Sequence, residues 1–426
     1  MNIATIGVED WLNVHEKSAT VDIAQSTIAS LTMDEILKLD GTDGQGFYEQ
    51  LGREKMNYGW IEGSPEFKQE VAALYQNVDP ENILQTNGAT GANLLALMTL
   101  VEPGDHVIAE YPTYQPLYEI PRTLGAEVEY WHIQEELGWQ PDIAELERLV
   151  RPNTKLICIN NASNPLGTVL PRETLEQIVE IARSVGAYVL SDEVYLPLED
   201  TDRFVSMADL YDRAVVTNSI SKTYSVPAAR IGWTVSNAEV ADRIRTYRDY
   251  TLICGGIFND ALAVHVLKNR ERILERNRAI VFGNRAIAQA WIDAEPRVRW
   301  VPPKGVSTSY IQLDIPMDDE EFCLKLLRER GGDGRIRLGN VVVGHGTSLC
   351  DGDAAPRYAP RGRLARGLSP DGGAFSTSKA PHVVAEFRYA RFDRRAGRQT
   401  GPKRPERPYR RKAILGFSCA RHDEPG

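Results

Sequence analysis

The sequence predicts an α/β fold of three layers, in which helices cover both faces of a mostly parallel sheet. Between residues 80 and 240, short β-branched runs alternate with longer segments whose apolar residues recur at helical spacing. Parallel strands need a crossover connection that is usually a helix, so this alternation favours a parallel sheet. The length of 426 residues predicts two or three domains, at about 100–200 residues each.

Seven runs are predicted as strands of this sheet. In chain order they are 83–86, 106–110, 126–131, 155–160, 187–191, 214–219 and 230–235. The predicted helices between them are 93–100, 143–150 and 172–184. Pro103 and Gly104 mark a turn into the second strand.

The flanking segments predict a second, smaller α+β domain. One helical stretch, 33–39, precedes the sheet; after it come one or two long helices over 262–294, strands within 298–313 and an amphipathic helix over 319–329. We predict that residues 1–44 form the N-terminal segment of the small domain, 45–290 the large domain, 291–330 the start of the C-terminal small domain, and 331–426 an atypical tail.

The tail is predicted from a change in composition near Gly331. Residues 331–426 carry 19 Lys and Arg against 9 Asp and Glu, a balance of +10, whereas the rest of the chain carries −20. Sixteen of the 19 bases are Arg, beside 15 Gly and 8 Pro. Irregular or disordered structure is the default for this composition. A shifted reading frame in GC-rich DNA would also produce it, so the small domain is expected to be incomplete.

Composition also excludes several classes of protein. The longest apolar stretch, 91–101, is too short for a membrane span of ~20 residues, and the N-terminus lacks the basic and apolar regions of a secretory signal. The five cysteines are widely spread without metal-ligand spacing, so we expect no metal site and a reducing, cytoplasmic location. No helix-turn-helix or aromatic-interleaved basic pattern supports nucleic-acid binding by the arginines.

The strongest signal for chemistry is the run from Ser219 to Lys222, with Arg230 eight residues after the lysine. A lysine at a strand end, beside hydroxyl groups and ahead of an arginine, can bind an anion. Ordinary exposed basic residues fit the same pattern, so the argument depends on three other loops. Each of these follows a predicted strand, where α/β folds place their ligands.

Each of the three loops offers a different group. Small residues from Gly88 onward let backbone N–H groups approach a phosphate at a helix N-terminus. Asn164 can donate a hydrogen bond to a phenolate oxygen. Asp192 ends a very apolar strand, where a carboxylate either caps a helix or meets a buried cation. A tight turn or a helix cap explains each loop alone, and their combination favours a ligand site.

Five motifs in this order resemble one family. They are YGWIEG at 58–63, GAT at 88–90, YPTY at 111–114, DEVY at 192–195, and the set Ser219, Lys222 and Arg230. The resemblance covers roughly residues 45–330 and is to fold-type I pyridoxal-phosphate enzymes of aminotransferase class I/II. Segments 23–27 and 247–251 are loosely similar to a subgroup that includes capreomycidine synthase-like enzymes.

The resemblance implies a pyridoxal 5′-phosphate site with three catalytic residues. Lys222 would form the Schiff base with the cofactor aldehyde, and Asp192 would keep the pyridine nitrogen protonated. Tyr195 would hydrogen-bond the ring O3′. The other implied cofactor contacts are Asn164 at O3′, Tyr114 on the ring face, Gly88, Ala89, Thr90, Ser219 and Arg230 at the phosphate, and Tyr58 at the phosphate of a neighbouring subunit. The last contact implies a homodimer with shared sites.

Two departures from the family pattern stand out. Ala162 replaces the proline that usually begins the Asn164 loop, while Asn164 itself is retained. The family binds the substrate carboxylate with an arginine near the C-terminus. Here Arg337 comes too early, and Ile414 stands where a second partial match needs the arginine, so the sequence assigns this role to no residue.

The implied function is an aminotransferase that moves an amino group between an L-amino acid and a 2-oxo acid, in amino acid metabolism and biosynthesis. Three alternatives stay open. One is a lyase, cyclase or oxidase with the same cofactor, for example on a guanidino amino acid. Another is a cofactor-binding protein whose catalysis is impaired by the altered C-terminus. The third, nucleic-acid binding by the basic tail, has the least support. The sequence does not identify the substrate.

Overall fold

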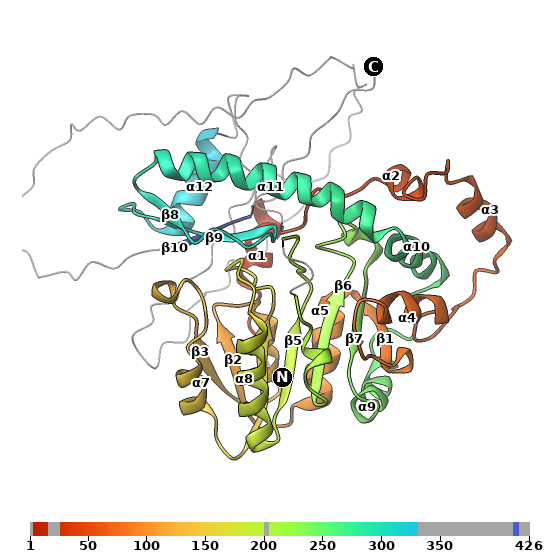
Figure 1. Cartoon of the computed structure of the whole chain (residues 1–426), viewed down its shortest axis with the longest axis horizontal. Helices are drawn as coiled ribbons and strands as arrows, with labels where there is room; N and C mark the ends of the chain where they lie inside the picture. The colour runs from red at the N-terminus through yellow and green to blue at the C-terminus, as the bar shows by residue number, and fades with distance from the viewer. Residues whose placement is uncertain (1–2, 16–25, 200–203, 331–411, 417–426) are drawn as a thin grey trace, which may run out of the picture. The chain divides into compact units, whose positions relative to one another are not determined.

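In the computed structural model, a seven-stranded sheet forms the main layer (Figure 1). The structure describes residues 3–15, 26–199, 204–330 and 412–416, and all of them belong to one structural unit. In spatial order the strands are β1 (Ile83–Asn87), β7 (Ile231–Val235), β6 (Ala214–Ser219), β5 (Tyr188–Asp192), β4 (Thr154–Asn160), β2 (His106–Tyr111) and β3 (Glu127–His132). Only β7 runs antiparallel to its neighbours, so the predicted mostly parallel sheet is confirmed.

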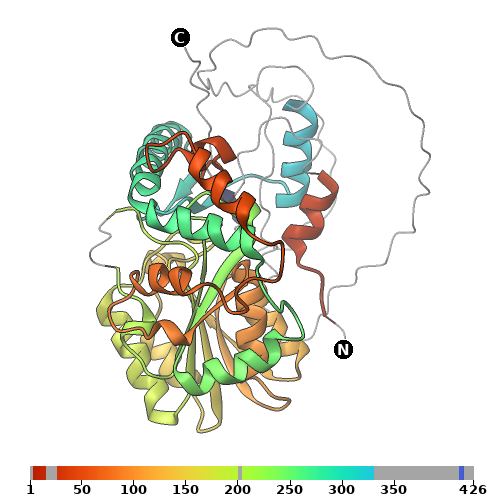
Figure 2. The same ribbon diagram turned by 90° about the vertical axis from the view of Figure 1, so that its right-hand side faces the viewer.

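Helices cover both faces of this sheet, as predicted (Figure 2). The first face packs on α4 (Pro65–Ala72), α7 (Ile143–Leu149), α8 (Arg172–Val185) and α10 (Ile257–Lys268). The second packs on α5 (Gly88–Leu100), α6 (Pro116–Thr123) and α9 (Ala238–Arg248). Strand β4 shows why both faces are apolar: Ile157 and Ile159 enter the first core, while Leu156 and Cys158 enter the second.

A smaller antiparallel sheet follows the long helix α11 (Arg270–Ala294). Its strands are β8 (Val298–Trp300), β9 (Thr308–Leu313) and β10 (Lys412–Gly416), with β9 in the middle. A separate apolar cluster joins this sheet to α11 and α12 (Asp319–Arg330), and Trp11 of α1 (Gly7–His15) packs against it. Strand β10 is the only described part of the tail; the other predictions for 331–426 lie outside the described residues.

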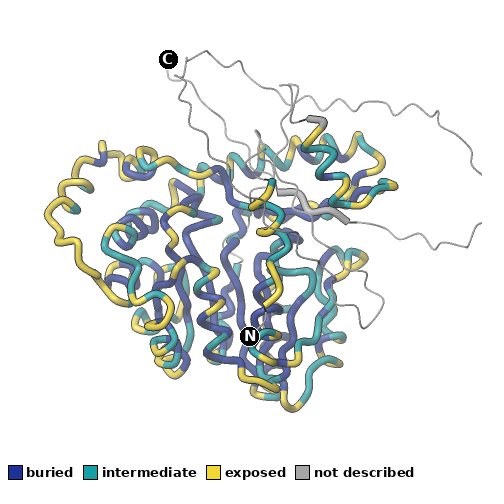
Figure 3. Tube along the Cα trace, turned by 180° about the vertical axis from the view of Figure 1, so that it is seen from behind, coloured by how far each residue is buried: buried dark blue, intermediate teal, exposed yellow. Residues whose placement is uncertain are grey.

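The N-terminal segment first packs on the small sheet through α1. It then continues through α2 and α3 to the main sheet. Helix α2 (Met33–Leu37) begins with a capping box, in which Thr32 and Glu35 exchange hydrogen bonds. Helix α3 (Gln45–Arg53) has no buried residue, and the chain from there to Ile61 is largely exposed (Figure 3). Short 3₁₀ turns lie at Pro80–Asn82, Glu135–Leu137, Met207–Asp209 and Pro227–Ala229.

The sheet was predicted more accurately than the helices. All seven strands lie within one or two residues of the predicted bounds, whereas α5 begins at Gly88 rather than at 93. Helices α1, α3, α4, α6 and α9 are present and were not predicted. In the described part of the chain, no helix combines the length and the hydropathy that a membrane span needs.

Candidate active site

All of the predicted site residues except Tyr58 gather at one edge of the main sheet. The carboxyl ends of parallel strands meet there, which is where α/β folds bind their ligands. In chain order this edge carries Gly88, Ala89 and Thr90 after β1, Tyr114 after β2, Asn164 after β4, Asp192 and Tyr195 at the end of β5, and Ser219 and Lys222 at the end of β6. Arg230 joins them because the antiparallel β7 begins at the same edge.

Lys222 lies half-buried in a turn after β6. Its Nζ donates a hydrogen bond of 2.6 Å to Oγ of Ser26, which the N-terminal segment brings from 196 residues away. Burial lowers the pKa of Lys222 to about 8, and the positive charge of Arg230 acts in the same direction. A lysine with this pKa is partly uncharged near neutral pH, which an amine nucleophile requires.

Asp192 is the buried carboxylate of the site, with only 1% of its surface exposed. Its Oδ2 accepts a hydrogen bond of 2.6 Å from Nδ2 of Asn93, and its Oδ1 accepts one of 3.1 Å from the Val194 N–H. Burial raises the pKa of Asp192 to about 6, and these two donors oppose that rise. These two hydrogen bonds favour the ionised form of the carboxylate, which suits contact with a cation.

The turn from β1 into α5 fits a phosphate group. Helix α5 begins at Gly88 without a side-chain cap, so its positive end is turned toward the site. Gly88 has φ +66°, and a Cβ there would lie 2.6 Å from Nη2 of Arg230. The Arg230 guanidinium and the N-terminus of α5 are thus neighbours, and Ser219 ends β6 at the same edge of the sheet. A phosphate dianion suits this donor set.

Aromatic and amide groups lie at the same sheet edge as this phosphate cradle and Lys222. The Tyr114 hydroxyl lies 3.2 Å from Oγ1 of Thr90, and burial raises the pKa of Tyr114. The Tyr195 hydroxyl is buried close to Ser26 without a well-formed hydrogen bond to it. Asn164 is held by its own N–H, which donates to Oδ1 of Asn160. These positions fit the ring of pyridoxal phosphate, with a buried hydroxyl left to donate to its oxygen.

The N-terminal segment closes one side of the site. Arg276 of α11 donates to the Ala29 carbonyl, and the Leu31 N–H donates to the Ser225 carbonyl, three residues after Lys222. The Ser307 hydroxyl donates to the carbonyl of Ser26. Ser26 is a site residue that the motifs did not identify, because its role depends on contacts across the whole chain.

A second unpredicted group is Glu9 on α1. The Gly7 N–H donates to Oε1 of Gln115, and Nε2 of Gln115 donates to the Thr5 carbonyl, so α1 is fixed one residue beyond Tyr114. From this position the exposed Glu9 acts electrostatically on both Lys222 and Tyr114. The acidic side chain therefore adds negative charge near Lys222 and Tyr114.

Tyr58 is the one predicted site residue that the structure does not bring to this edge. Its side chain is 69% exposed, in a segment that Arg248 fixes by hydrogen bonds to the Ile61 and Gln85 carbonyls. Gly59 lies so close to Ile257 that a Cβ at Gly59 would overlap the isoleucine side chain. The segment is therefore firmly held while the Tyr58 ring points into solvent.

Two buried glutamates, Glu110 and Glu193, lie near the site, and no ion pair joins either of them to another described residue. Oε1 of Glu193 accepts hydrogen bonds from the Ser191 hydroxyl and the Met207 N–H, whereas its Oε2 is buried without a partner among the described residues. Burial raises the pKa of Glu193 to about 8 and that of Glu110 to about 8 as well. Both carboxyl groups therefore keep a proton at neutral pH.

These raised pKa values predict a loss of stability as pH rises. A carboxyl group whose pKa is about 8 when folded and near 4.5 when unfolded favours folding below pH 4.5, and this contribution disappears as pH rises to 8. Glu193→Gln should therefore flatten the fall in unfolding free energy between pH 5 and pH 8 by roughly 1–3 kcal/mol. Urea unfolding of the cofactor-free protein at several pH values measures it.

Glu180→Gln, on the exposed side of α8, is the matched control and should follow the wild-type pH profile. If Glu193→Gln also follows that profile, Glu193 is ionised in the folded protein and the prediction is wrong.

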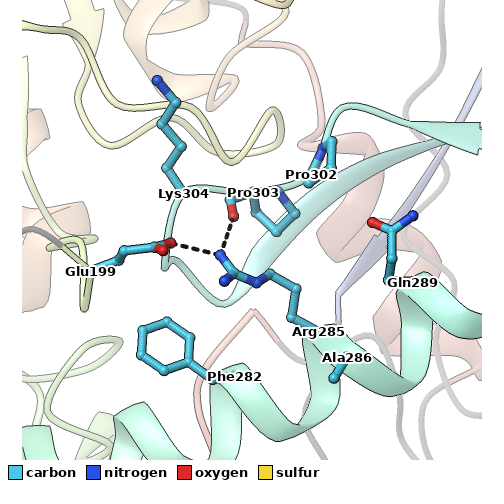
Figure 4. A pocket seen from close by; sticks show the side chains of 8 residues that line it. All are labelled: Glu199, Phe282, Arg285, Ala286, Gln289, Pro302, Pro303 and Lys304. Carbon is cyan, nitrogen blue, oxygen red and sulfur yellow. Dashed lines mark hydrogen bonds and ion pairs between the residues drawn. The ribbon is translucent and has the colours of Figure 1, made fainter.

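A pocket away from this edge lies between α11 and the turn before β9 (Figure 4). Its central cation, Arg285, is bonded to Glu199 at 2.6 Å and to the Pro303 carbonyl at 3.1 Å. The Arg285 guanidinium thus links α11 to the loop at Glu199 and to the loop at Pro303. None of the predicted site residues lines this pocket.

Comparisons with known proteins agree with this geometry. Residues 33–332 match the family model for aminotransferase class I and II. An aspartate aminotransferase from Thermotoga maritima is 30% identical over 64% of this chain and 73% of its own, and the capreomycidine synthase of Streptomyces vinaceus is 24% identical over 85% and 91%. The crystal structure of a PLP-dependent aminotransferase from Streptococcus suis superposes with a TM-score of 0.76 at 55% identity, covering 78% of this chain and 88% of that one.

The family match covers about 70% of the chain and confirms the resemblance inferred from the motifs. It ends at residue 332, beside the change of composition predicted at Gly331. The chain therefore belongs to the class I and II aminotransferases, transaminases that depend on pyridoxal 5′-phosphate.

Proposed function

We propose that this chain moves an amino group between an L-amino acid and a 2-oxo acid, and that Lys222 is the amine that forms the Schiff base with pyridoxal phosphate. The observation that carries the proposal is the placement of Lys222. Its half-buried amine, with a pKa lowered to about 8, lies at the same sheet edge as Asp192 and the phosphate cradle of Gly88 and Arg230.

Lys222 also moves the reacting proton in this proposal. Bound pyridoxal phosphate supplies an electron-withdrawing ring that stabilises negative charge at the substrate Cα. With the cofactor bound, the free Nζ of Lys222 would accept the proton from the substrate Cα and would donate it to C4′ of the cofactor. The Ser26 hydroxyl, at 2.6 Å, orients Nζ before the substrate arrives.

The remaining predicted residues hold the cofactor in this proposal. Asp192 keeps the ring nitrogen protonated, and the Tyr195 hydroxyl and the Asn164 amide bind the ring oxygen. Tyr114 covers the ring face. Support comes from the burial of Asp192 and Tyr195 and from the hydroxyl that each tyrosine turns toward the site.

A spectral screen of the purified protein, loaded with pyridoxal phosphate, tests the reaction class. Transfer of the substrate amino group leaves pyridoxamine phosphate and a 2-oxo acid, whereas a lyase or cyclase restores the aldehyde. We expect at least one amino acid to give the amine form in a single turnover. Restoration of the aldehyde with every reacting amino acid would indicate a lyase or cyclase. Absence of any amino-acid-dependent change would indicate a cofactor-binding protein without catalysis.

A substrate with a cationic side chain is the more specific candidate, and Glu9 favours it. This carboxylate acts electrostatically on Lys222 and Tyr114, so we place the side chain of an amino acid bound at Lys222 beside it. A guanidinium or ammonium group there would form a charge-assisted hydrogen bond to Glu9. The same substrate class suits the cyclase alternative, which the spectral screen separates.

Glu9→Gln tests this substrate class. We expect KM for arginine, lysine and ornithine to rise about 10-fold, because charge-assisted hydrogen bonds contribute ~1.5–3 kcal/mol. KM for alanine and norvaline should change less than about 2-fold. Asp10→Asn, one residue further along α1, is the matched control and should resemble wild type. Equal effects on cationic and neutral substrates would assign Glu9 to general electrostatics rather than to side-chain recognition.

A homodimer with shared sites is proposed from the exposed aromatic patch, defined by Tyr58, Trp60, Ile61, Ile253 and Phe258. Each of these side chains is at least 42% exposed in the single chain, which is unusual for so many large apolar groups in one region. A second copy seated on this patch would cover it and bring Tyr58 to the phosphate cradle of its partner. A solution mass of twice 47.6 kDa would support the dimer, and a monomer would contradict it.

A cytoplasmic, biosynthetic role completes the proposal. The cysteines that the structure describes, Cys158, Cys254 and Cys323, are free thiols, which suits a reducing compartment.

A further inference from the structure

A chain of buried polar side chains runs from β6 through α5 to β5. Thr217 and Asp192 are register partners on neighbouring strands, and Asn93 of α5 lies against both. Oγ1 of Thr217 donates to Oδ1 of Asn93 at 2.7 Å, and Nδ2 of Asn93 donates to Oδ2 of Asp192 at 2.6 Å. Thr217 and Asn93 are 0% exposed.

We propose that Asn93, oriented by Thr217, is a positioning residue that holds Asp192 as an anion in the plane needed to face the cofactor ring nitrogen. The proposal rests on the assignment of Asp192 as the partner of that nitrogen. It goes beyond the assignment by naming what keeps a fully buried carboxylate charged before and during the reaction.

The direction of each hydrogen bond supports the proposal. A carboxylate can only accept hydrogen bonds, and an amide has one accepting and one donating end. The Thr217 hydroxyl donates to the amide oxygen, and the NH₂ group points to Asp192. A flipped amide would place its oxygen against the carboxylate, which is favourable only if Asp192 carries a proton. The network therefore matches the ionised form of Asp192.

Burial makes this support necessary. Removal of water favours the neutral acid, which is why the pKa of Asp192 is raised, and the Asn93 hydrogen bond is the largest effect that opposes the rise. The other described groups that act on this carboxylate are the Val194 N–H, Lys222, Glu110, Tyr114 and Tyr195. Only the first of these also donates a hydrogen bond to it.

Asn93 should therefore influence the position of the proton that Asp192 and the cofactor ring nitrogen share. A ring nitrogen and a carboxylate compete for one proton, and whatever stabilises the anion leaves the proton on the nitrogen. Loss of a hydrogen bond to a charged group costs ~1.5–3 kcal/mol, or roughly 10- to 100-fold in that equilibrium. Without Asn93 the proton should move toward Asp192, and the ring should lose much of its electron-withdrawing power.

The experiment uses full-length protein loaded with pyridoxal 5′-phosphate labelled with ¹⁵N in the ring, and reads the protonation of the nitrogen from its chemical shift. Wild type should show a protonated nitrogen. Asn93→Leu should shift the resonance toward the neutral pyridine value and lower kcat about 10- to 100-fold, with KM for the amino acid within about 3-fold. Thr217→Val, which is nearly isosteric, should give a smaller shift in the same direction.

Thr99→Val is the matched control for Thr217→Val. Thr99 is a buried threonine of α5, the helix that carries Asn93, and its hydroxyl has no partner among the described residues. Its ¹⁵N shift and kcat should equal those of wild type. A protonated nitrogen and unchanged kcat in both Asn93→Leu and Thr217→Val would overturn this proposal alone. A neutral nitrogen in wild type would overturn the assignment of Asp192 and this proposal with it.

Discussion

Replacing Lys222 with alanine should lower amino transfer by at least about 10³-fold, because general acid–base catalysis alone contributes ~10²–10⁴-fold. With its pKa at about 8, roughly a quarter of this amine is uncharged at pH 7.5, compared with roughly 0.1% of an ordinary lysine. The variant loses both the nucleophile and the proton carrier. Borohydride reduction of the loaded wild type, followed by peptide mapping, should attach the cofactor to Lys222 and to no other lysine.

Two further variants serve as controls. Lys222→Arg tests whether a positive charge at this position is enough, and Lys304→Ala tests whether loss of any lysine lowers activity. The arginine keeps the positive charge but stays protonated at any usable pH, so it should be as inactive as alanine. Lys304, in the pocket beside α11, should be dispensable for the reaction. Cofactor attached to another lysine, or activity restored by arginine, would refute the assignment of Lys222.

The predictable part of the site was local in sequence. Lys222, Asp192 and Gly88 each stand at the end of a buried strand, and strand ends are readable because an apolar run stops at a polar or small residue. The parallel topology then brings these ends to one edge, so a correct strand prediction also places the site. Arg230 joins them only because β7 is antiparallel, which no local pattern shows.

Contacts distant in sequence could not be predicted. Asn93 is separated from Asp192 by 99 residues, and Ser26 is separated from Lys222 by 196. A signal for Asn93 did exist, since it is a polar residue inside the most apolar helical run of the chain. Such a residue needs a buried partner. The sequence does not say which strand provides it.

The missed helices have physical reasons of their own. Helix α6 contains Pro121, and proline inside a helix normally argues against it, although Pro116 suits the first position. It persists because Leu117 and Ile120 bury their side chains in the core shared with α5. Helix α9 is polar over most of its surface, but Val240, Ala241 and Ile244 join that core and Tyr247 packs against it. Tertiary packing, rather than intrinsic propensity, stabilises both.

Asp192→Asn should lower kcat by about 10³-fold while the cofactor still binds. A carboxylate about 4 Å from a cation contributes ~4 kcal/mol at the effective dielectric constant of protein sites, which corresponds to roughly 10³ in rate. The amide cannot hold the ring nitrogen protonated. The substitution also brings one NH₂ group against a donor, either Asn93 or the Val194 N–H, so unfolding should become easier by ~1–3 kcal/mol.

The double variant Asn93→Asp/Asp192→Asn distinguishes the loss of kcat from the loss of stability. It keeps one carboxylate and one amide in the buried network. The carboxylate introduced at position 93 accepts from Thr217 and from the amide introduced at position 192, and the oxygen of that amide accepts from the Val194 N–H. Thermal unfolding should therefore return toward wild type. Activity should stay low, because the negative charge has moved one side chain away from the ring nitrogen. Recovery of both stability and kcat would mean that Asp192 acts only through folding, and an Asp192→Asn variant with wild-type kcat would lead to the same conclusion.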